Sequence, residues 1–183
     1  MWKHKKELRS VCMGILSGNP KNEPMHCGEV YGLSAQLAVA KAAKDGYQVY
    51  CNHAGDKELK QYIKGVIKNS IEPSIEEIEE ILIANDIVVP PTPAERPEVD
   101  VEQIPPGARF QDAQIAYAIA KDIATGITAM STLITQCIRE DIAMMLTQQN
   151  AKALKDGAAL LQIMKDKGWL VPPPLHMETK NKE

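Results

Sequence analysis

The chain has 183 residues, of which 44% are hydrophobic and 25% charged, a composition typical of one globular domain and not of a disordered protein. Aromatic residues make up only 4%, and the net charge is -3, so the sequence lacks the stacking residues and the basic surface of a nucleic-acid-binding protein. The charge-free stretch 123–138 contains several hydroxyl side chains and is too short to span a membrane, and no signal-peptide core follows the N-terminal lysines. We therefore expect a cytoplasmic protein with reduced thiols that binds no nucleic acid.

The first half of the chain predicts a helical hairpin over residues 26–86. Residues 1–25 hold a short amphipathic segment and then the breaker-rich sequence SGNPKNEP, which we interpret as a short helix and a linker. Apolar residues then recur at helical spacing, and Asp56 is a suitable N-cap for a second helix. Pro73 interrupts that second helix, but the apolar pattern keeps its phase, so we expect a kink near Asn69–Pro73 and not a break.

Residues 87–110 predict an irregular connection, because they hold six of the twelve prolines. Fully extended, this segment reaches about 80 Å, whereas a helix of 28 residues is about 42 Å long. The connection is therefore long enough to run the whole length of a helical bundle.

The second half predicts another hairpin over residues 111–168, with a helix beginning near Gln111–Asp112 and a second one capped by Asp141. Gly168 ends it, Trp169 anchors the chain end, and residues 175–183 form a charged tail. The halves end alike, in IEEILIANDIVVPP and LLQIMKDKGWLVPPP, which favours a duplicated layout. The alternative is that any helical hairpin ends in breakers.

Together these elements predict an all-α protein, a ferritin-like four-helix bundle made of two hairpins (26–86 and 111–168) with a long Pro-rich crossover, all within residues 26–174. Simple up-down-up-down winding is the alternative. The two topologies differ in one placement: a crossover brings Cys137 to the end of the bundle that holds Cys27, and simple winding brings it near Cys51.

Several segments carry a family resemblance: HCGEVYGL (26–33), GDKEL (55–59), VVPP (88–91), IPPGARFQDAQIA (104–116), CIREDIAMM (137–145) and LLQIMKDKGWLVPP (160–173). In these segments the chain resembles a family of uncharacterised proteins from spore-forming Bacilli that is related in layout to spore coat protein F. The resemblance implies a ferritin-like bundle and association with the spore coat, and it brings no established activity or catalytic residues. Pro73 and the Gln111–Asp112 pair, where the family usually has Thr-Asp, depart from its pattern.

A ferritin-like layout raises the question of a di-iron site, which needs a Glu from each of two helices and a Glu-x-x-His pair from each of the other two. The only such pair here is Glu23–His26, which Pro24 interrupts. A smaller site for a divalent metal is a weaker candidate, with His26, Cys27 and Glu29 as ligands and Cys12 as a further donor. The alternative is that His26 and Glu29 cap the first helix and that Cys27 is a small buried apolar residue. We therefore expect no resident cofactor.

Lys121 and Asp122 are the only charges between Ala113 and Ile138, in a long helix of small and apolar residues. If Asp122 faces inward, its burial requires a polar partner, and Lys44 or Gln149 could supply one. The alternative is that Lys121 and Asp122 mark the solvated side of the helix.

The sequence therefore favours a spore coat-like structural or interaction protein, not an enzyme, that associates with protein partners or with itself. The alternative is a bundle that binds a small ligand or a metal near His26 and Glu29, and a carboxylate metalloenzyme is a more remote third hypothesis.

Overall fold

A computed structural model describes residues 24–174, and this part of the chain contains helices and no strand. The predictions for residues 1–23 and 175–183 lie outside the described residues. The elements, in chain order, are α2 (Cys27–His53), α3 (Lys57–Val66), the π-helix η1 (Ile67–Ile71), α4 (Glu72–Ile83), the 3-10 turns η2 (Val101–Gln103) and η3 (Pro106–Ala108), α5 (Asp112–Gln136) and α6 (Glu140–Asp166). No helix of the described residues is long and apolar enough to cross a membrane.

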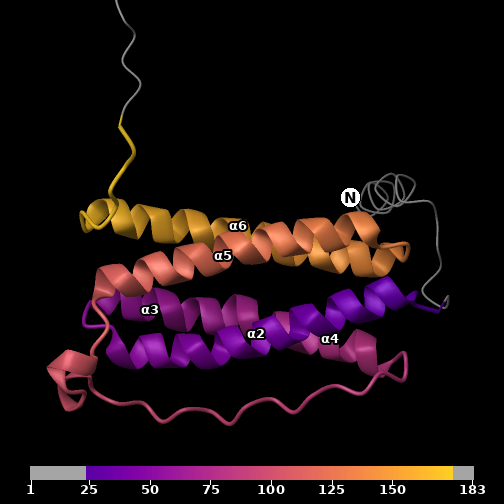
Figure 1. Cartoon of the computed structure of the whole chain (residues 1–183), viewed down its shortest axis with the longest axis horizontal. Coiled ribbons are helices and arrows are strands. Elements are labelled where there is room, and N and C mark those ends of the chain that lie inside the picture. The colour runs from indigo at the N-terminus through magenta and orange to yellow at the C-terminus, as the bar shows by residue number, and fades with distance from the viewer. Residues whose placement is uncertain (1–23, 175–183) are drawn as a thin grey trace, which may run out of the picture.

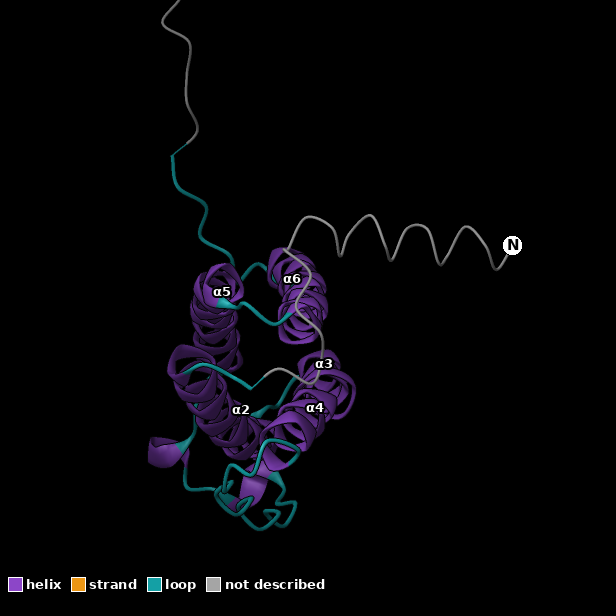
Figure 2. Ribbon diagram, turned by 90° about the vertical axis from the view of Figure 1, so that its right-hand side faces the viewer, coloured by secondary structure: helices purple, strands orange, loops and turns teal. Residues whose placement is uncertain are grey.

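Two antiparallel hairpins pack against each other, α2 with α3–η1–α4 and α5 with α6 (Figure 1). Viewed along the bundle, α5 lies beside α2, and α6 lies beside α3 and α4 (Figure 2). The segment between α4 and α5 returns along the whole length of the first hairpin (Figure 1). His26 at the start of α2 contacts Gln136 at the end of α5, which places Cys137 at the Cys27 end of the bundle. The predicted crossover topology is therefore confirmed, and the simple up-down alternative is wrong.

The predicted kink at Pro73 is a π-helical turn. Proline has no N–H, and its ring collides with the carbonyl four residues earlier in a regular α-helix. In η1 the backbone hydrogen bonds reach back five residues instead of four, so that the Glu72 N–H donates to the carbonyl of Ile67. Insertion of one residue lets the helix continue through Pro73 with its apolar face still directed inward.

The two hairpins end in the same backbone geometry, which supports the duplicated layout. After α4, Asp86 has φ 60° and the Ile87 N–H donates to Leu82 O. After α6, Gly168 has φ 68° and the Trp169 N–H donates to Met164 O. Both are the left-handed helix endings that glycine favours. Trp169 then packs on the core, as predicted.

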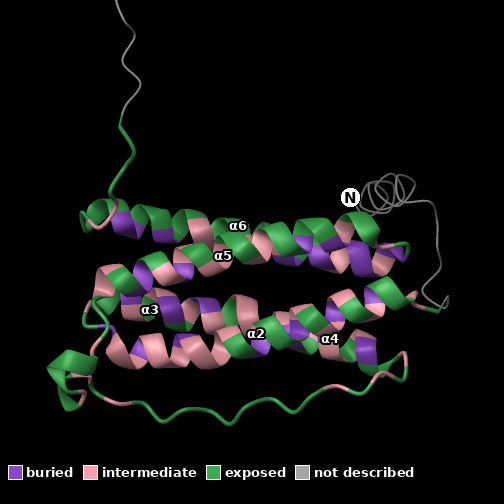
Figure 3. Ribbon diagram, viewed as in Figure 1, coloured by how far each residue is buried: buried purple, intermediate pink, exposed green. Residues whose placement is uncertain are grey.

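Buried residues occur along all the long helices (Figure 3). The apolar ones form two clusters, one toward each end of the bundle. One lies at the end that carries the α2–α3 turn and includes Leu59, Ile63 and Ile119. The other lies at the opposite end and includes Leu33, Ile78 and Leu146. There α2 and α5 approach closely, since a Cβ at Gly32 would lie 2.3 Å from Leu133 Cδ1. Between the clusters the helices carry smaller and more polar side chains.

The crossover is fixed to one side of α2 by polar contacts. Arg96 Nε donates to Asp45 Oδ1 at 2.6 Å, and the Lys44 ammonium lies 3.0 Å from Glu95. The Asn52 amide makes two hydrogen bonds with the backbone of the crossover: it donates to Pro97 O at 3.0 Å and accepts from the Val99 N–H at 3.1 Å. These contacts hold residues 87–110, which we call the strap, in place against α2 although most of the segment has no regular secondary structure.

Candidate functional site

The residues proposed as metal ligands form the N-terminal cap of α2. His26 Nδ1 accepts from the Gly28 N–H at 3.0 Å, and its Nε2 lies 3.1 Å from Gln136 O. Glu29 is 1% exposed and closes the capping box by accepting from the His26 N–H. Its other oxygen accepts from the Ile138 and Arg139 N–H groups, each at 2.8 Å. Each side chain therefore uses one polar atom to cap α2 and the other to contact the second hairpin.

Cys27 does not join this arrangement, because its side chain is exposed and free. Cys12 lies outside the described residues. Among residues 24–174 no three His, Cys, Asp or Glu side chains are grouped closely enough to hold a metal ion. The part of the proposed metal site that the structure describes is thus a helix cap.

A second carboxylate makes the reciprocal contact at the opposite end of the bundle. Asp112, in the first turn of α5, accepts from the Gly55 N–H at 2.9 Å and from the Asp56 N–H at 3.1 Å. Each hairpin therefore begins with an acidic side chain that binds the backbone of the other hairpin's turn. We call the pair Glu29 and Asp112 the end clamps. The sequence shows both acids, but nothing in it shows that the backbone N–H groups that donate to them lie across the bundle.

The Glu29 clamp also corrects the predicted start of α6. The N-cap is Arg139 and not Asp141, which lies inside the first turn. The Arg139 guanidinium is buried and pairs with Asp141 at 2.7 Å and with Asn85 at 2.9 Å. Glu29 accepts from the N–H groups of Ile138 and Arg139, which directly precede the first residue of α6, and so fixes the chain at the point where this helix begins.

The predicted partners of Asp122 are engaged elsewhere. The Lys44 ammonium lies 2.8 Å from Glu72, and this hydrogen bond raises the pKa of Lys44. Gln149 is buried, as anticipated, but it accepts from Ser74 at 2.7 Å and donates to Glu77 at 2.9 Å. The pairing of Asp122 with Lys44 or Gln149 is therefore wrong. The side chain of Asp122 is 41% exposed, and its ionic partner is the neighbouring Lys121, at 3.6 Å.

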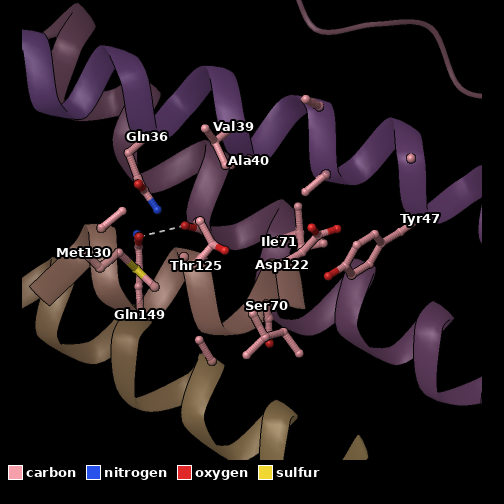
Figure 4. Close-up of a pocket in the computed structure, with 18 of the residues that line it drawn as sticks. Gln36, Val39, Ala40, Tyr47, Ser70, Ile71, Asp122, Thr125, Met130 and Gln149 are labelled. Atoms are coloured by element: carbon pink, nitrogen blue, oxygen red, sulfur yellow. Dashed lines mark hydrogen bonds between the residues drawn. The ribbon is translucent and has the colours of Figure 1, made fainter. Parts of the chain in front are cut away.

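Asp122 does face a pocket of about 530 Å³ between the two core clusters, which sequence reasoning missed (Figure 4). Residues from all four long helices of the bundle line this pocket. Most of the lining side chains are small or apolar, including Ala43, Gly46, Gly126 and Ala129. A Cβ placed on Gly46 or Gly126 would meet no atom within 4 Å. The small residues at helical spacing were visible in the sequence. They indicate close packing and an unfilled space equally well, so the pattern alone could not reveal the pocket.

The polar groups of this pocket do not fit a di-iron centre. Asp122 is the one carboxylate among its lining residues, and no histidine lines it. A carboxylate-bridged pair of irons needs several Glu and His ligands directed to one point in the middle of the bundle. The residues that line this pocket therefore leave room for a ligand but do not provide the ligands of a metal centre.

Comparison with known proteins places the chain in a family. Residues 13–181 match the model of a protein family of unknown function, DUF3231. The chain belongs to the DUF3231 family. It is 43% identical to the uncharacterized protein YvdQ of Bacillus subtilis over 166 residues, covering 91% of this chain and 97% of YvdQ. The predicted resemblance to a Bacillus family is confirmed.

Solved structures agree with the fold of this DUF3231 member. A crystal structure of a "putative spore coat protein" from Bacillus halodurans is similar with a TM-score of 0.84 and 39% identity, covering 87% of this chain and 100% of that one. A protein of Anabaena variabilis with DJ-1-like and ferritin-like domains matches with a TM-score of 0.61 and 17% identity, over 91% of this chain and 43% of that one. The second likeness shows the fold alone, and it confirms the ferritin-like prediction.

Proposed function

We propose that this protein is a non-enzymatic structural component associated with the bacterial spore. The similarity to the Bacillus halodurans coat-type protein supports this proposal, because it extends over the whole of that chain at 39% identity. The observation that carries it is the use of the buried polar groups. Glu29, Arg139 and Gln149 all bind backbone or neighbouring side chains and hold the bundle together.

Catalytic sites differ from this arrangement, because their acids and bases face a substrate with free hydrogen-bonding capacity. The buried Glu29 and Arg139 side chains are instead engaged in contacts within the protein at one end of the bundle, and Gln149 binds Ser74 and Glu77. A protein of this kind contributes shape and surface, and not reactive groups.

The outer face of α6 provides a surface suited to assembly. Exposed small and apolar residues recur there at spacings of three and four, the pattern of a coiled-coil seam: Thr147, Ala151, Leu154, Ala158 and Leu161. Leu154 is 56% and Leu161 41% exposed. We infer that copies of the chain associate through this seam.

A fluorescent fusion expressed from the native promoter tests the spore assignment. We expect the signal to collect at the developing spore, and the untagged protein to fractionate with the isolated coat. Uniform signal in the mother cell, with protein only in the soluble fraction, would contradict the proposal. Metal analysis of protein purified without an affinity tag provides a second test, since stoichiometric iron or zinc would overturn the non-enzymatic assignment.

Sedimentation of Leu154→Glu and Leu161→Glu variants tests the seam. We expect each charge to shift the protein toward the monomer, because it would be buried without a partner in the interface. Val88→Glu is the matched control, since Val88 is 93% exposed and lies on the strap. A wild-type protein that is monomeric at high concentration, or an effect of the control equal to that of the seam variants, would refute the seam.

A further inference from the structure

The pocket between the core clusters has the size and the lining of a small-molecule site. Ligand pockets generally occupy about 300–1,000 Å³ and combine apolar walls with a few placed polar groups. This pocket, of about 530 Å³, lies within that range. Its walls come from both hairpins, so it forms only when the bundle is assembled.

One polar group that lines the pocket is not engaged by the protein. Tyr47 is 4% exposed as a whole residue, and its hydroxyl, which opens onto the pocket, makes no hydrogen bond with any described residue. By contrast, the Tyr62 hydroxyl donates to Asp156 O at 2.9 Å, and the Tyr117 hydroxyl accepts from the Val171 N–H at 3.0 Å. A hydroxyl that opens onto a pocket can hydrogen-bond to what enters the pocket. Figure 4 shows the Tyr47 ring extending inward from α2, with its hydroxyl directed into the pocket.

Asp122 supplies the charge on the same side of the pocket (Figure 4). Its cation, Lys121, is the next residue in the chain, is 77% exposed and lies at 3.6 Å, which leaves the carboxylate able to accept hydrogen bonds from the pocket side. Among the residues that line the pocket, the one positively charged side chain is that of Lys152, which is exposed. Burial, together with the charge of Asp122, raises the pKa of Tyr47, so this hydroxyl remains neutral and able to accept or donate.

We propose that this pocket binds an aliphatic primary ammonium compound, with the alkyl chain between the small side chains and the ammonium group donating to Asp122 and Tyr47. An ammonium has three donors and no acceptor, which matches a carboxylate and a hydroxyl oxygen. The alkyl chain fills the space that Gly46 and Gly126 leave open. This site is independent of the spore assignment and of the α6 seam.

Calorimetric titration of the full chain with octylammonium, octanoate and octan-1-ol tests the proposal, with all three below their micellar concentrations. We expect octylammonium to bind at least about tenfold more tightly than octanoate, because a charge-assisted hydrogen bond contributes about that factor. Asp122→Asn should remove the difference between the two. Tyr47→Phe should weaken octylammonium while leaving the unliganded protein at least as stable, since no protein partner of the hydroxyl is lost.

Filling the pocket provides the structural control. Gly126→Leu should abolish binding of all three compounds, and Gly46→Leu serves as a second variant should the first not fold. Gly65→Leu is the matched control, because Gly65 is also helical, does not line the pocket, and its Cβ would meet only Asn69 Nδ2, at 3.9 Å. Octanoate binding as tightly as octylammonium, equal binding by wild type and Gly126→Leu, or no binding of octylammonium at millimolar concentration would each overturn the proposal.

Discussion

Replacement of Glu29 by alanine tests the end clamp at the start of α2. The carboxylate is 1% exposed and accepts from three backbone N–H groups, those of His26, Ile138 and Arg139. Water can reach the partly exposed His26 N–H in the variant, but the Arg139 N–H is buried and would be left without an acceptor. A hydrogen bond to a charged group contributes about 1.5–3 kcal/mol, and an unsatisfied buried donor costs about 1–3 kcal/mol.

Counting mainly the two N–H groups of the α5–α6 turn, we expect Glu29→Ala to lower the free energy of unfolding by about 3–5 kcal/mol. This is a large part of the roughly 5–15 kcal/mol typical of a domain. Glu29→Gln should cost less, about 1–2 kcal/mol, because its amide oxygen can still accept from that turn while its NH₂ group faces the His26 N–H.

Urea denaturation followed by circular dichroism measures these losses. Glu58→Ala is the control, because Glu58 is also an acid in the first turn of a helix but is 59% exposed. We expect it to change stability by less than about 0.5 kcal/mol. A loss below about 1 kcal/mol for Glu29→Ala, or one equal to that of the control, would refute the clamp as an energetic link between the hairpins.

Asp86→Gly should raise stability by about 0.5–1 kcal/mol, because Asp86 has φ 60° and glycine adopts that conformation without steric cost; a lower melting temperature would contradict this. Asn52→Ala should cost about 1–2 kcal/mol and speed protease cleavage of the strap, because Asn52 binds both Pro97 and Val99; unchanged cleavage would show that the strap is held elsewhere. The hydrogen bond from Lys167 and the N–H groups of α3 hold the pKa of Asp56 below its usual range. Its carboxylate therefore stabilises the fold above the unfolded pKa of about 4, and the contribution is lost as pH falls through the folded pKa. Asp56→Asn, which keeps a cap, should be less stable than wild type at neutral pH and equal to it in strong acid; a constant difference in urea titrations at both pH values would contradict the assignment.

The helices and their order could be predicted because their determinants are local. Apolar spacing, the Asp56 cap, the Gly168 ending and the disturbance at Pro73 each depend on a few neighbouring residues. The length of residues 87–110 favoured the crossover, since a segment of that reach can return along the bundle. Simple winding stayed open until the contact of His26 with Gln136 decided the topology.

The site could not be predicted in the same way, because its contacts join residues far apart in the sequence: 110 positions separate Glu29 from Arg139, and 57 separate Gly55 from Asp112. Asp141 has the side chain of a good cap, but the helix begins earlier, at Glu140, where Glu29 from the other hairpin binds the N–H groups of Ile138 and Arg139. Lys44 was a reasonable partner for Asp122 by charge, and yet the bend at η1 brings Glu72 to it instead. The pocket depends on the space left between packed helices, and the identity of a single residue does not reveal that space.

The end clamps bear on how the chain can come apart. Each hairpin leaves the backbone donors of its own bend to an acid on the other hairpin, at opposite ends of the molecule. Neither half is therefore stable alone: a fragment that ends before the strap, or one that begins after it, would expose its apolar face to water and lose the carboxylate that binds its turn. The two halves should melt as one cooperative unit, and separately produced halves should regain helical structure only when mixed.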